Sequence, residues 1–253
     1  MKNIIELKNL RKVYRIGEEK VVALDNVSLD IQKGEFCCLL GTSGSGKSTL
    51  LNLMAGLEKP TKGTIRIKGK AIEKMSEKQL AKFRRDNLGF VFQSYNLLPM
   101  LTALENVGIP LTFKGVSKSI RDKKAMEMLK AVGLATHYKH KPSQMSGGQQ
   151  QRVGIARAFV TMPEIVFADE PTGNLDSKTT KEVMDLITTM ARKNNQTLVI
   201  VTHDMQIASY ADRIVHILDG NIEKIDIINK AGGFSNEEVD GSIDNIGTVP
   251  AGV

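Results

Sequence analysis

The sequence has no tryptophan, only two cysteines and few aromatic residues, and each scarcity narrows what the chain can be. Cys37 and Cys38 are neighbours, and neighbouring side chains in a strand point to opposite faces. They therefore suit neither a disulfide framework nor a metal site, and we expect two small apolar residues in a cytoplasmic protein. Aromatic residues form 5% of the chain, which leaves few platforms on which nucleic-acid bases could stack.

Long hydrophobic runs are also missing. A membrane-spanning helix needs about 18 or more consecutive apolar residues, and the sequence contains no such run. The segment from Met1 to Glu6 lacks the apolar core of a secretory signal. A role at a membrane would therefore require a separate partner chain.

Positive charge exceeds negative charge, with a formal net charge of +7 over 253 residues. Such a balance fits nucleic acid or an anionic membrane, but by itself it favours a soluble protein kept away from neutrality. Residues 231–253 are acidic and glycine-containing, without lysine or arginine, so we expect a flexible or loosely docked tail. Lysines and arginines gather between residues 114 and 141. A solvated helical face is the favoured interpretation there, with anionic lipid headgroups as the alternative.

Short β-like runs alternate with helical stretches, a pattern typical of an α/β core. The expected strands are Ile4–Lys8, Phe36–Leu40, Thr64–Ile67, Leu88–Phe92, Ile165–Ala168, Leu198–Val201, Arg213–Leu218 and Asn221–Ile225, the last two forming a hairpin at Asp219-Gly220. Residues 94–160 contain no convincing β-run. Ala125, Met128, Leu129 and Val132 instead fall on one helical face, which Ser117 or Ser119 could cap and Gly133 could end.

These patterns predict a domain over residues 1–230. Its α/β core would comprise residues 1–93 and 161–230, with an antiparallel β portion at the N-terminal end. Residues 94–160 would form an inserted helical subdomain, and residues 231–253 the tail.

The run from Gly41 to Ser48 fits the spacing G-x-x-x-x-G-K-S, and it lies between a buried strand and an apolar helical run. Glycines let the backbone curl so that its N–H groups converge on phosphate oxygens, aided by the helix N-terminus. Lys47 should reach the β- and γ-phosphates, and Ser48 should bind Mg²⁺. The expected nucleotide-binding residues of this loop are Gly41, Thr42, Ser43, Gly44, Ser45, Gly46, Lys47, Ser48 and Thr49.

A pair of carboxylates, Asp169 and Glu170, ends the apolar strand Ile165–Ala168. In nucleoside triphosphatases with this loop, an aspartate at such a strand end holds Mg²⁺ opposite the phosphates. The neighbouring Glu170 is suited to orient or deprotonate the attacking water.

A third motif, Met145-Ser146-Gly147-Gly148-Gln149, resembles the LSGGQ signature of ABC transporter ATPases, with Met145 in place of the usual leucine. Together with the preceding motifs, it identifies the chain as similar to the ATP-binding subunits of that family over roughly residues 3–225.

The resemblance implies roles for further residues. Tyr14 corresponds to the aromatic that stacks on adenine, Gln93 to the glutamine that contacts Mg²⁺ or water, Asp176 to the acid of the D-loop and His203 to the switch histidine. His203 would hold the γ-phosphate and the attacking water, so Lys47, Glu170 and His203 are the predicted catalytic residues. The predicted metal-binding residues are Ser48, Gln93 and Asp169.

The family resemblance also implies the assembly. In such proteins ATP bound to the phosphate loop of one chain is covered by the signature segment of a second copy, so we expect a head-to-tail dimer with ATP and Mg²⁺. The dimer would drive an integral membrane permease from the cytoplasmic side. A short cytoplasmic helix of the permease should dock near the apolar run Leu97, Leu98, Met100 and Leu101.

Within the family, Tyr14–Gly17 and Phe92–Pro99 look most like macrolide-efflux and lipoprotein-release subunits. Two alternatives remain: an ATPase that drives mechanical signalling to a cell-wall hydrolase or a sensor, and a soluble ABC ATPase acting on nucleic acid or ribosomes. The single set of motifs and the short spacing from Ser48 to Ser146 disfavour the second.

Overall fold

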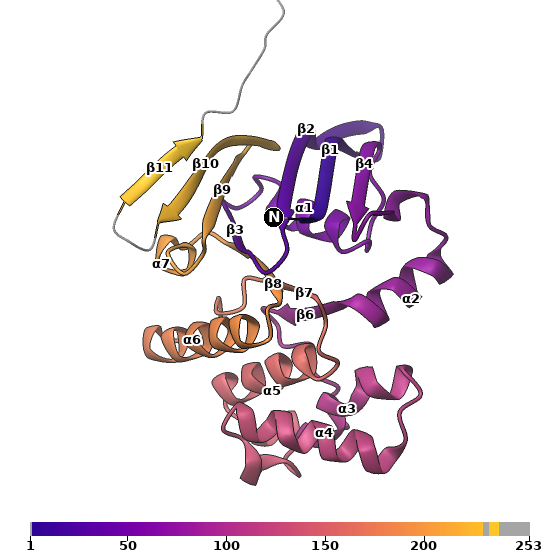
Figure 1. Cartoon of the computed structure of the whole chain (residues 1–253), viewed down its shortest axis with the longest axis vertical. Helices are drawn as coiled ribbons and strands as arrows, with labels where there is room; N and C mark the ends of the chain where they lie inside the picture. Colours follow the sequence, from indigo (N-terminus) through magenta and orange to yellow (C-terminus); the bar gives the residue numbers. More distant parts are fainter. Residues whose placement is uncertain (1, 230–232, 238–253) are drawn as a thin grey trace, which may run out of the picture.

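The computed structural model describes residues 2–229 and 233–237. It contains a large mixed sheet and a smaller antiparallel sheet, with the helices of residues 103–159 gathered at one end of the molecule (Figure 1). The predicted α/β fold with an antiparallel β portion is therefore confirmed.

The large sheet has the strand order β11-β10-β9-β3-β8-β7-β6. Its parallel part comprises β3 (Phe36–Leu40), β6 (Leu88–Phe92), β7 (Ile165–Asp169), β8 (Thr197–Thr202) and β9 (Arg213–Leu218). These strands are apolar on both faces because each face is covered. Cys37 and Cys38 show this directly, since they belong to the hydrophobic clusters on opposite sides of β3.

The small sheet has the order β2-β1-β4-β5, formed by β1 (Asn3–Ile16), β2 (Glu19–Gln32), β4 (Lys62–Ile67) and β5 (Lys70–Ala71). Strand β2 is absent from the sequence prediction. Its pairing with β1 contains register shifts, and Asn26 has a φ of 56°, so its alternation of apolar and polar residues is interrupted.

The segment predicted to be helical holds α3 (Ala103–Phe113), α4 (Lys118–Ala131) and α5 (Gly147–Phe159). In α4, Ala125 and Leu129 are buried and Met128 packs against the same core, as the spacing predicts. Ser117 occupies the N-cap position, and Gly133 follows the helix with a φ of 74°. In Figure 1 these helices lie together below the sheets, with α6 (Ser177–Lys193) beside α5.

The remaining helices cover the sheets. Helix α1 (Lys47–Met54) follows β3 and packs into the cluster shared with the small sheet. Helix α7 (Met205–Ala208) follows β8, and α2 (Glu77–Asn87) leads into β6. The sequence analysis did not predict α2, although Ser76 and Gln79 form a capping box at its start.

The acidic C-terminal segment differs from its prediction in one part. Residues Gly233–Glu237 form β11, which pairs antiparallel with β10 (Asn221–Asn229), so this part adds an edge strand to the large sheet. A pairing of main-chain groups needs few large apolar side chains, which explains why composition did not reveal it. Residues 230–232 and 238–253, on which the rest of the prediction falls, lie outside the described residues. Within the described part of the chain, no helix is long and apolar enough to cross a membrane.

Candidate functional site

The predicted phosphate-binding and catalytic residues meet at one edge of the large sheet. Parallel strands end at the same edge, and β8 lies between β3 and β7, with β6 next to β7. The phosphate loop leaves β3, His203 follows β8, Asp169 ends β7 and Gln93 follows β6. Residues separated by more than a hundred positions thus become neighbours.

The phosphate loop is shaped by close backbone contacts. Gly46 has a φ of +104°, and a Cβ atom there would lie 2.6 Å from the Ala23 carbonyl oxygen. A Cβ at Gly41 would lie 2.2 Å from the Ile217 carbonyl oxygen. Among the described residues, no side chain caps the N-terminus of α1. The first N–H groups of this helix therefore remain available for an anionic ligand.

Lys47 lies within this loop with 5% of its surface exposed. Its Nζ donates a hydrogen bond to the Thr42 carbonyl oxygen at 2.6 Å, so the ammonium group is held over the loop backbone. Burial lowers the pKa of Lys47, while the carboxylates of Glu170 and Asp169 act in the opposite direction. Lys47 thus lies beside the loop that would bind the phosphates and near the carboxylates of Asp169 and Glu170.

Two of the three predicted metal-binding residues, Ser48 and Asp169, are in contact. Ser48 Oγ donates to Asp169 Oδ1 at 3.2 Å. Burial raises the pKa of Asp169, partly offset by this hydrogen bond. A hydroxyl and a carboxylate are oxygen ligands of the kind Mg²⁺ prefers, usually completed by phosphate oxygens and water. The donor set therefore fits Mg²⁺ bound with a nucleotide.

The third, Gln93, is turned toward another loop. Its Nε2 lies 3.5 Å from Asn174 Oδ1, and Asn174 Nδ2 donates to the Gln93 carbonyl oxygen at 3.1 Å. The structure thus joins the loop after β6 to the loop after β7. Asn174 belongs to the predicted D-loop segment Gly173-Asn174-Leu175-Asp176, but its bond to Gln93 was not predicted, because the two residues lie 81 positions apart.

Glu170 and His203 contact each other. His203 Nδ1 and Glu170 Oε1 are 3.1 Å apart. Glu170 adopts a φ of 42°, and its N–H donates to the Val201 carbonyl oxygen at 3.0 Å, which fixes the backbone next to β8. Both side chains line a hollow of about 610 Å³ that also includes Thr42, Ser43 and His216. His216, to which the sequence analysis assigned no function, is bonded to Asp226 at 2.7 Å.

Tyr14 lies on β1, near the first turn of α1. Its hydroxyl donates to Glu58 Oε2 at 2.7 Å, and Lys12 Nζ lies 4.8 Å from its ring centroid. Burial and the bond to Glu58 raise the pKa of Tyr14, while the Thr49 hydroxyl acts to lower it. The ring is therefore anchored beside the helix that carries the phosphate loop.

The signature segment forms a second, separate site at the start of α5. Ser146 Oγ accepts from the Gln149 N–H at 3.3 Å, and Gln149 Oε1 accepts from the Ser146 N–H at 2.9 Å. Gly147, Gly148 and Asp176 line the same hollow of about 470 Å³. Asp176 caps α6 by accepting from the Thr179 N–H at 3.0 Å. Among the described residues that line these two hollows, none is common to both.

Two contacts at the signature segment were missed from the sequence. Gln149 Nε2 lies 3.3 Å from His137 Nε2. The buried Gln151 donates from Nε2 to the Pro171 carbonyl oxygen, which ties α5 to the residue after Glu170. The third glutamine of a Gln-Gln-Gln run carries no sequence signal that would distinguish it from its neighbours.

A large apolar hollow lies away from both sites. It has a volume of about 730 Å³ and lies between α2, β6, α3 and α5. Phe90, Phe92, Ile109 and Phe113 line it, with Lys78, Lys82 and Arg85 among the charged residues. The predicted docking run is divided: Leu97 packs against the core, whereas Leu98 and Leu101 line a different hollow of about 550 Å³.

Comparison with known proteins places this geometry in context. A family profile described as ABC transporter matches residues 24–173. The uncharacterized ABC transporter ATP-binding protein MJ0796 of Methanocaldococcus jannaschii is 48% identical over 225 residues, covering 87% of this chain and 96% of that protein. The lipoprotein-releasing system ATP-binding protein LolD of Geobacter metallireducens is 47% identical, covering 88% and 99%.

The macrolide export ATP-binding/permease protein MacB of Syntrophobacter fumaroxidans is 46% identical over 87% of this chain but only 31% of its own length. A solved structure of MJ0796, described as a dimer in a post-hydrolysis state bound to ADP and Pi, superposes with a TM-score of 0.84. It is 46% identical and matches 89% of this chain and 99% of its own.

Proposed function

This chain belongs to the ABC transporter family as an ATP-hydrolysing subunit, and we propose that two copies enclose two ATP molecules at sites that neither copy completes alone. In this arrangement ATP binds at Lys47 of one copy and is covered by Ser146 of the other.

The observation that carries this proposal is the presence of two different anion-binding half-sites in one chain. The start of α1 offers free N–H groups and Lys47, whereas the start of α5 offers Ser146 and two glycines in a separate hollow. Pairing two copies about a two-fold axis brings each kind of half-site against the other. The solved dimer of the relative MJ0796 with ADP and Pi supports this assembly.

The chemistry follows from the positions of the side chains. Lys47 neutralises the phosphate charge, and Ser48 and Asp169 would hold Mg²⁺, which polarises the phosphoryl oxygens. Glu170 takes the proton of the attacking water, and His203, 3.1 Å from Glu170, orients the water and the γ-phosphate. Loss of the γ-phosphate removes the anion that joins the copies, so the dimer opens.

The output is passed to a membrane permease, so the protein works peripherally on the cytoplasmic side of a membrane. The relatives named for lipoprotein release and macrolide export support an export or release system. The hollow between α2 and α3 is our choice for the permease helix, in place of the Leu97–Leu101 run. Its apolar lining with Lys78, Lys82 and Arg85 suits an apolar helix that carries carboxylates.

The composite site can be tested by ATP-dependent dimerisation. Glu170→Gln should bind ATP without turnover and elute as a dimer in size-exclusion chromatography. Adding Ser146→Arg should abolish the dimer but preserve ATP binding, measured with a fluorescent ATP analogue, because the signature segment acts on the other copy's nucleotide. Adding Lys47→Ala to Glu170→Gln instead should weaken both dimer formation and ATP binding. A dimer that survives Ser146→Arg, or a Glu170→Gln protein that stays monomeric with ATP, would contradict the proposal.

A further inference from the structure

Large apolar side chains stand exposed on the outer surface of the helical subdomain. Met100 has 77% of its surface exposed, Phe113 68%, Ile120 53% and Leu98 49%. Leu98 and Phe113 line the hollow of about 550 Å³ formed by α3, α4 and the segment before α3. A solvated surface gains nothing from such exposure, so these side chains point to a contact.

The same surface is strongly basic. Lys118, Arg121 and Lys139 line the hollow together with Leu98 and Phe113. Residues 98–124 and 134–141 contain seven lysines and arginines but only two carboxylates, Glu105 and Asp122. We call this surface, defined by Leu98, Met100, Arg121, Lys139 and Lys141, the basic apolar face. Phe113 is left out because it also lines the hollow assigned to the permease helix.

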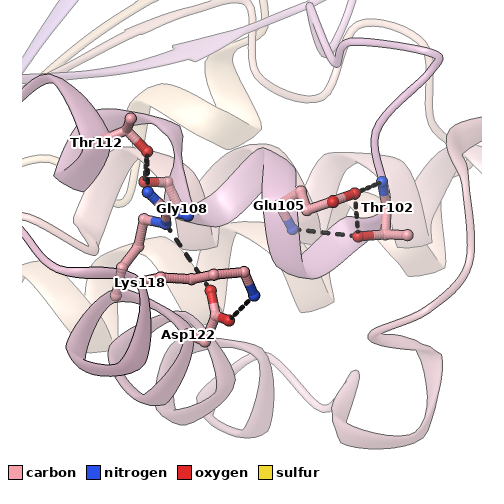
Figure 2. Close-up of polar contacts among 7 residues, drawn as sticks. Thr102, Glu105, Gly108, Thr112, Lys118 and Asp122 are labelled. Atoms are coloured by element: carbon pink, nitrogen blue, oxygen red, sulfur yellow. Dashed lines mark hydrogen bonds and ion pairs between the residues drawn. The ribbon is translucent and has the colours of Figure 1, made fainter.

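Both carboxylates are engaged within the subdomain (Figure 2). Glu105 Oε2 accepts from the Thr102 N–H at 2.8 Å and from its hydroxyl at 2.7 Å, which caps α3. Asp122 accepts from Lys118 at 2.7 Å and lies 3.8 Å from Arg121. The acids therefore serve internal contacts. Asp122 offsets the charge of Lys118, so the excess of positive charge comes from the other lysines of the two segments.

We infer that the basic apolar face rests on the anionic headgroups of a lipid bilayer. Lysines on flexible stems attract a diffuse layer of negative charge without needing a fixed partner geometry. Protruding apolar side chains such as Met100 can enter the headgroup region. The pattern is that of a surface that lies on a membrane without spanning it.

An acidic protein segment fits this face less well. Arg121 is the group best suited to bind a carboxylate with two parallel hydrogen bonds, but it already donates to Thr112 Oγ1 at 2.9 Å and lies beside Asp122. The remaining cations are lysines, which act as point charges. Met100 is also 77% exposed, so a bound helix would have to enclose a side chain that projects outward.

The expected attraction is weak and reversible. Each lysine or arginine near an anionic surface changes the partition onto the membrane by about fivefold, and the attraction falls off within about 8–10 Å at ordinary ionic strength. A permease that already holds the subunit near the membrane would raise the effective concentration at that surface. The contact would then orient the helical subdomain against the bilayer.

Vesicle sedimentation of the full chain tests the inference without ATP. Wild-type protein should pellet with vesicles containing a quarter phosphatidylglycerol, much less with pure phosphatidylcholine, and less as salt rises. The Lys139→Gln/Lys141→Gln variant should partition about 25-fold more weakly, because two exposed charges are lost. Met100→Ser should also weaken the partition. ATPase rates should stay unchanged, since these residues lie outside the nucleotide sites.

The matched control is Lys181→Gln/Lys193→Gln, which removes two exposed lysines from α6 and changes the net charge equally. It should keep wild-type vesicle binding. Equal losses in the two double variants, equal binding to both vesicle types, or displacement from vesicles by low concentrations of polyglutamate would overturn the inference. None of these results would bear on the proposed ATPase dimer, because no hydrolysis or dimerisation is measured.

Discussion

The two helix N-termini that serve the proposed nucleotide site are built in different ways. Helix α1 begins at Gly46 and, among the described residues, receives no side-chain cap. Helix α5 begins at Ser146, which forms a complete capping box with Gln149. One helix leaves its first N–H groups for a ligand, and the other satisfies part of them internally.

This difference implies a division of labour. The free N–H groups and Lys47 at α1 can bind nucleotide in a single chain. The signature segment has its own capping box, so its contribution can be conditional on the approach of a second copy. Such a design keeps the two functions separable: one half-site sets nucleotide affinity, and the other sets whether the copies join.

The largest expected effect falls on the catalytic side. Glu170→Gln should reduce the ATPase rate by about 10²–10⁴-fold, because the general base is lost while the nucleotide-binding groups remain. Steady-state phosphate release measures the rate, and Glu127→Gln on α4 is a matched control that should behave as wild type. Equal rates in Glu170→Gln and wild type would remove Glu170 from its proposed role.

The next effect separates the half-sites by affinity. Lys47→Ala should weaken ATP binding by about 10–100-fold, since a charge-assisted bond to phosphate is worth about 1.5–3 kcal/mol. Ser146→Ala should leave the ATP affinity of the monomer unchanged. Equilibrium titration at protein concentrations below dimerisation measures both, and a loss of affinity in Ser146→Ala would mean that the signature segment acts within its own chain.

A smaller effect concerns stability. Ser146→Ala removes an N-cap and should lower the free energy of unfolding by about 1 kcal/mol. Ser48→Ala at the uncapped helix should cost less, because only its bond to Asp169 is lost. Urea denaturation without nucleotide compares the two. Equal losses would show that the capping box does not stabilise α5 as its geometry indicates.

The smallest effect is a pH dependence. Burial raises the pKa of Asp169 in the folded protein, so ionising this carboxyl disfavours the folded state as pH rises through that pKa. Asp169→Asn should therefore stabilise the nucleotide-free protein at neutral pH, by less than about 1 kcal/mol because solvent screens the half-buried group. The gain should vanish in acid, where wild-type Asp169 is protonated. A variant less stable than wild type at pH 7 would contradict this sign.

The sequence predicted the catalytic edge well because each motif is local and directly follows a strand. Strands β3, β6 and β9 have the predicted bounds, and β7 and β8 differ by one residue at their ends. Contacts between distant segments could not be predicted from the sequence. The hydrogen bond between Gln93 and Asn174 requires that two loops lie side by side, and no residue spacing indicates that they do. The roles of the predicted site residues in catalysis remain predictions.

Irregular elements were missed for other reasons. Register shifts in β2 broke the alternation on which strand prediction depends, and β11 is held by main-chain pairing. The docking run Leu97–Leu101 was treated as one apolar surface. In the structure Leu97 packs against the core, whereas Leu98 and Leu101 line a hollow. The chain turns within this run, and a run of apolar residues does not reveal such a turn.

The bond from Gln151 to Pro171 has a consequence for communication within the assembly. Gln151 lies on the helix that would cover the other copy's ATP, and Pro171 follows the glutamate that would act on the chain's own ATP. A single side-chain amide therefore links the helix that would cover one nucleotide to the segment that would act on the other. Any tilt of α5 as it meets or leaves one ATP moves the backbone beside Glu170, so each copy can report the state of one nucleotide to the chemistry of the other.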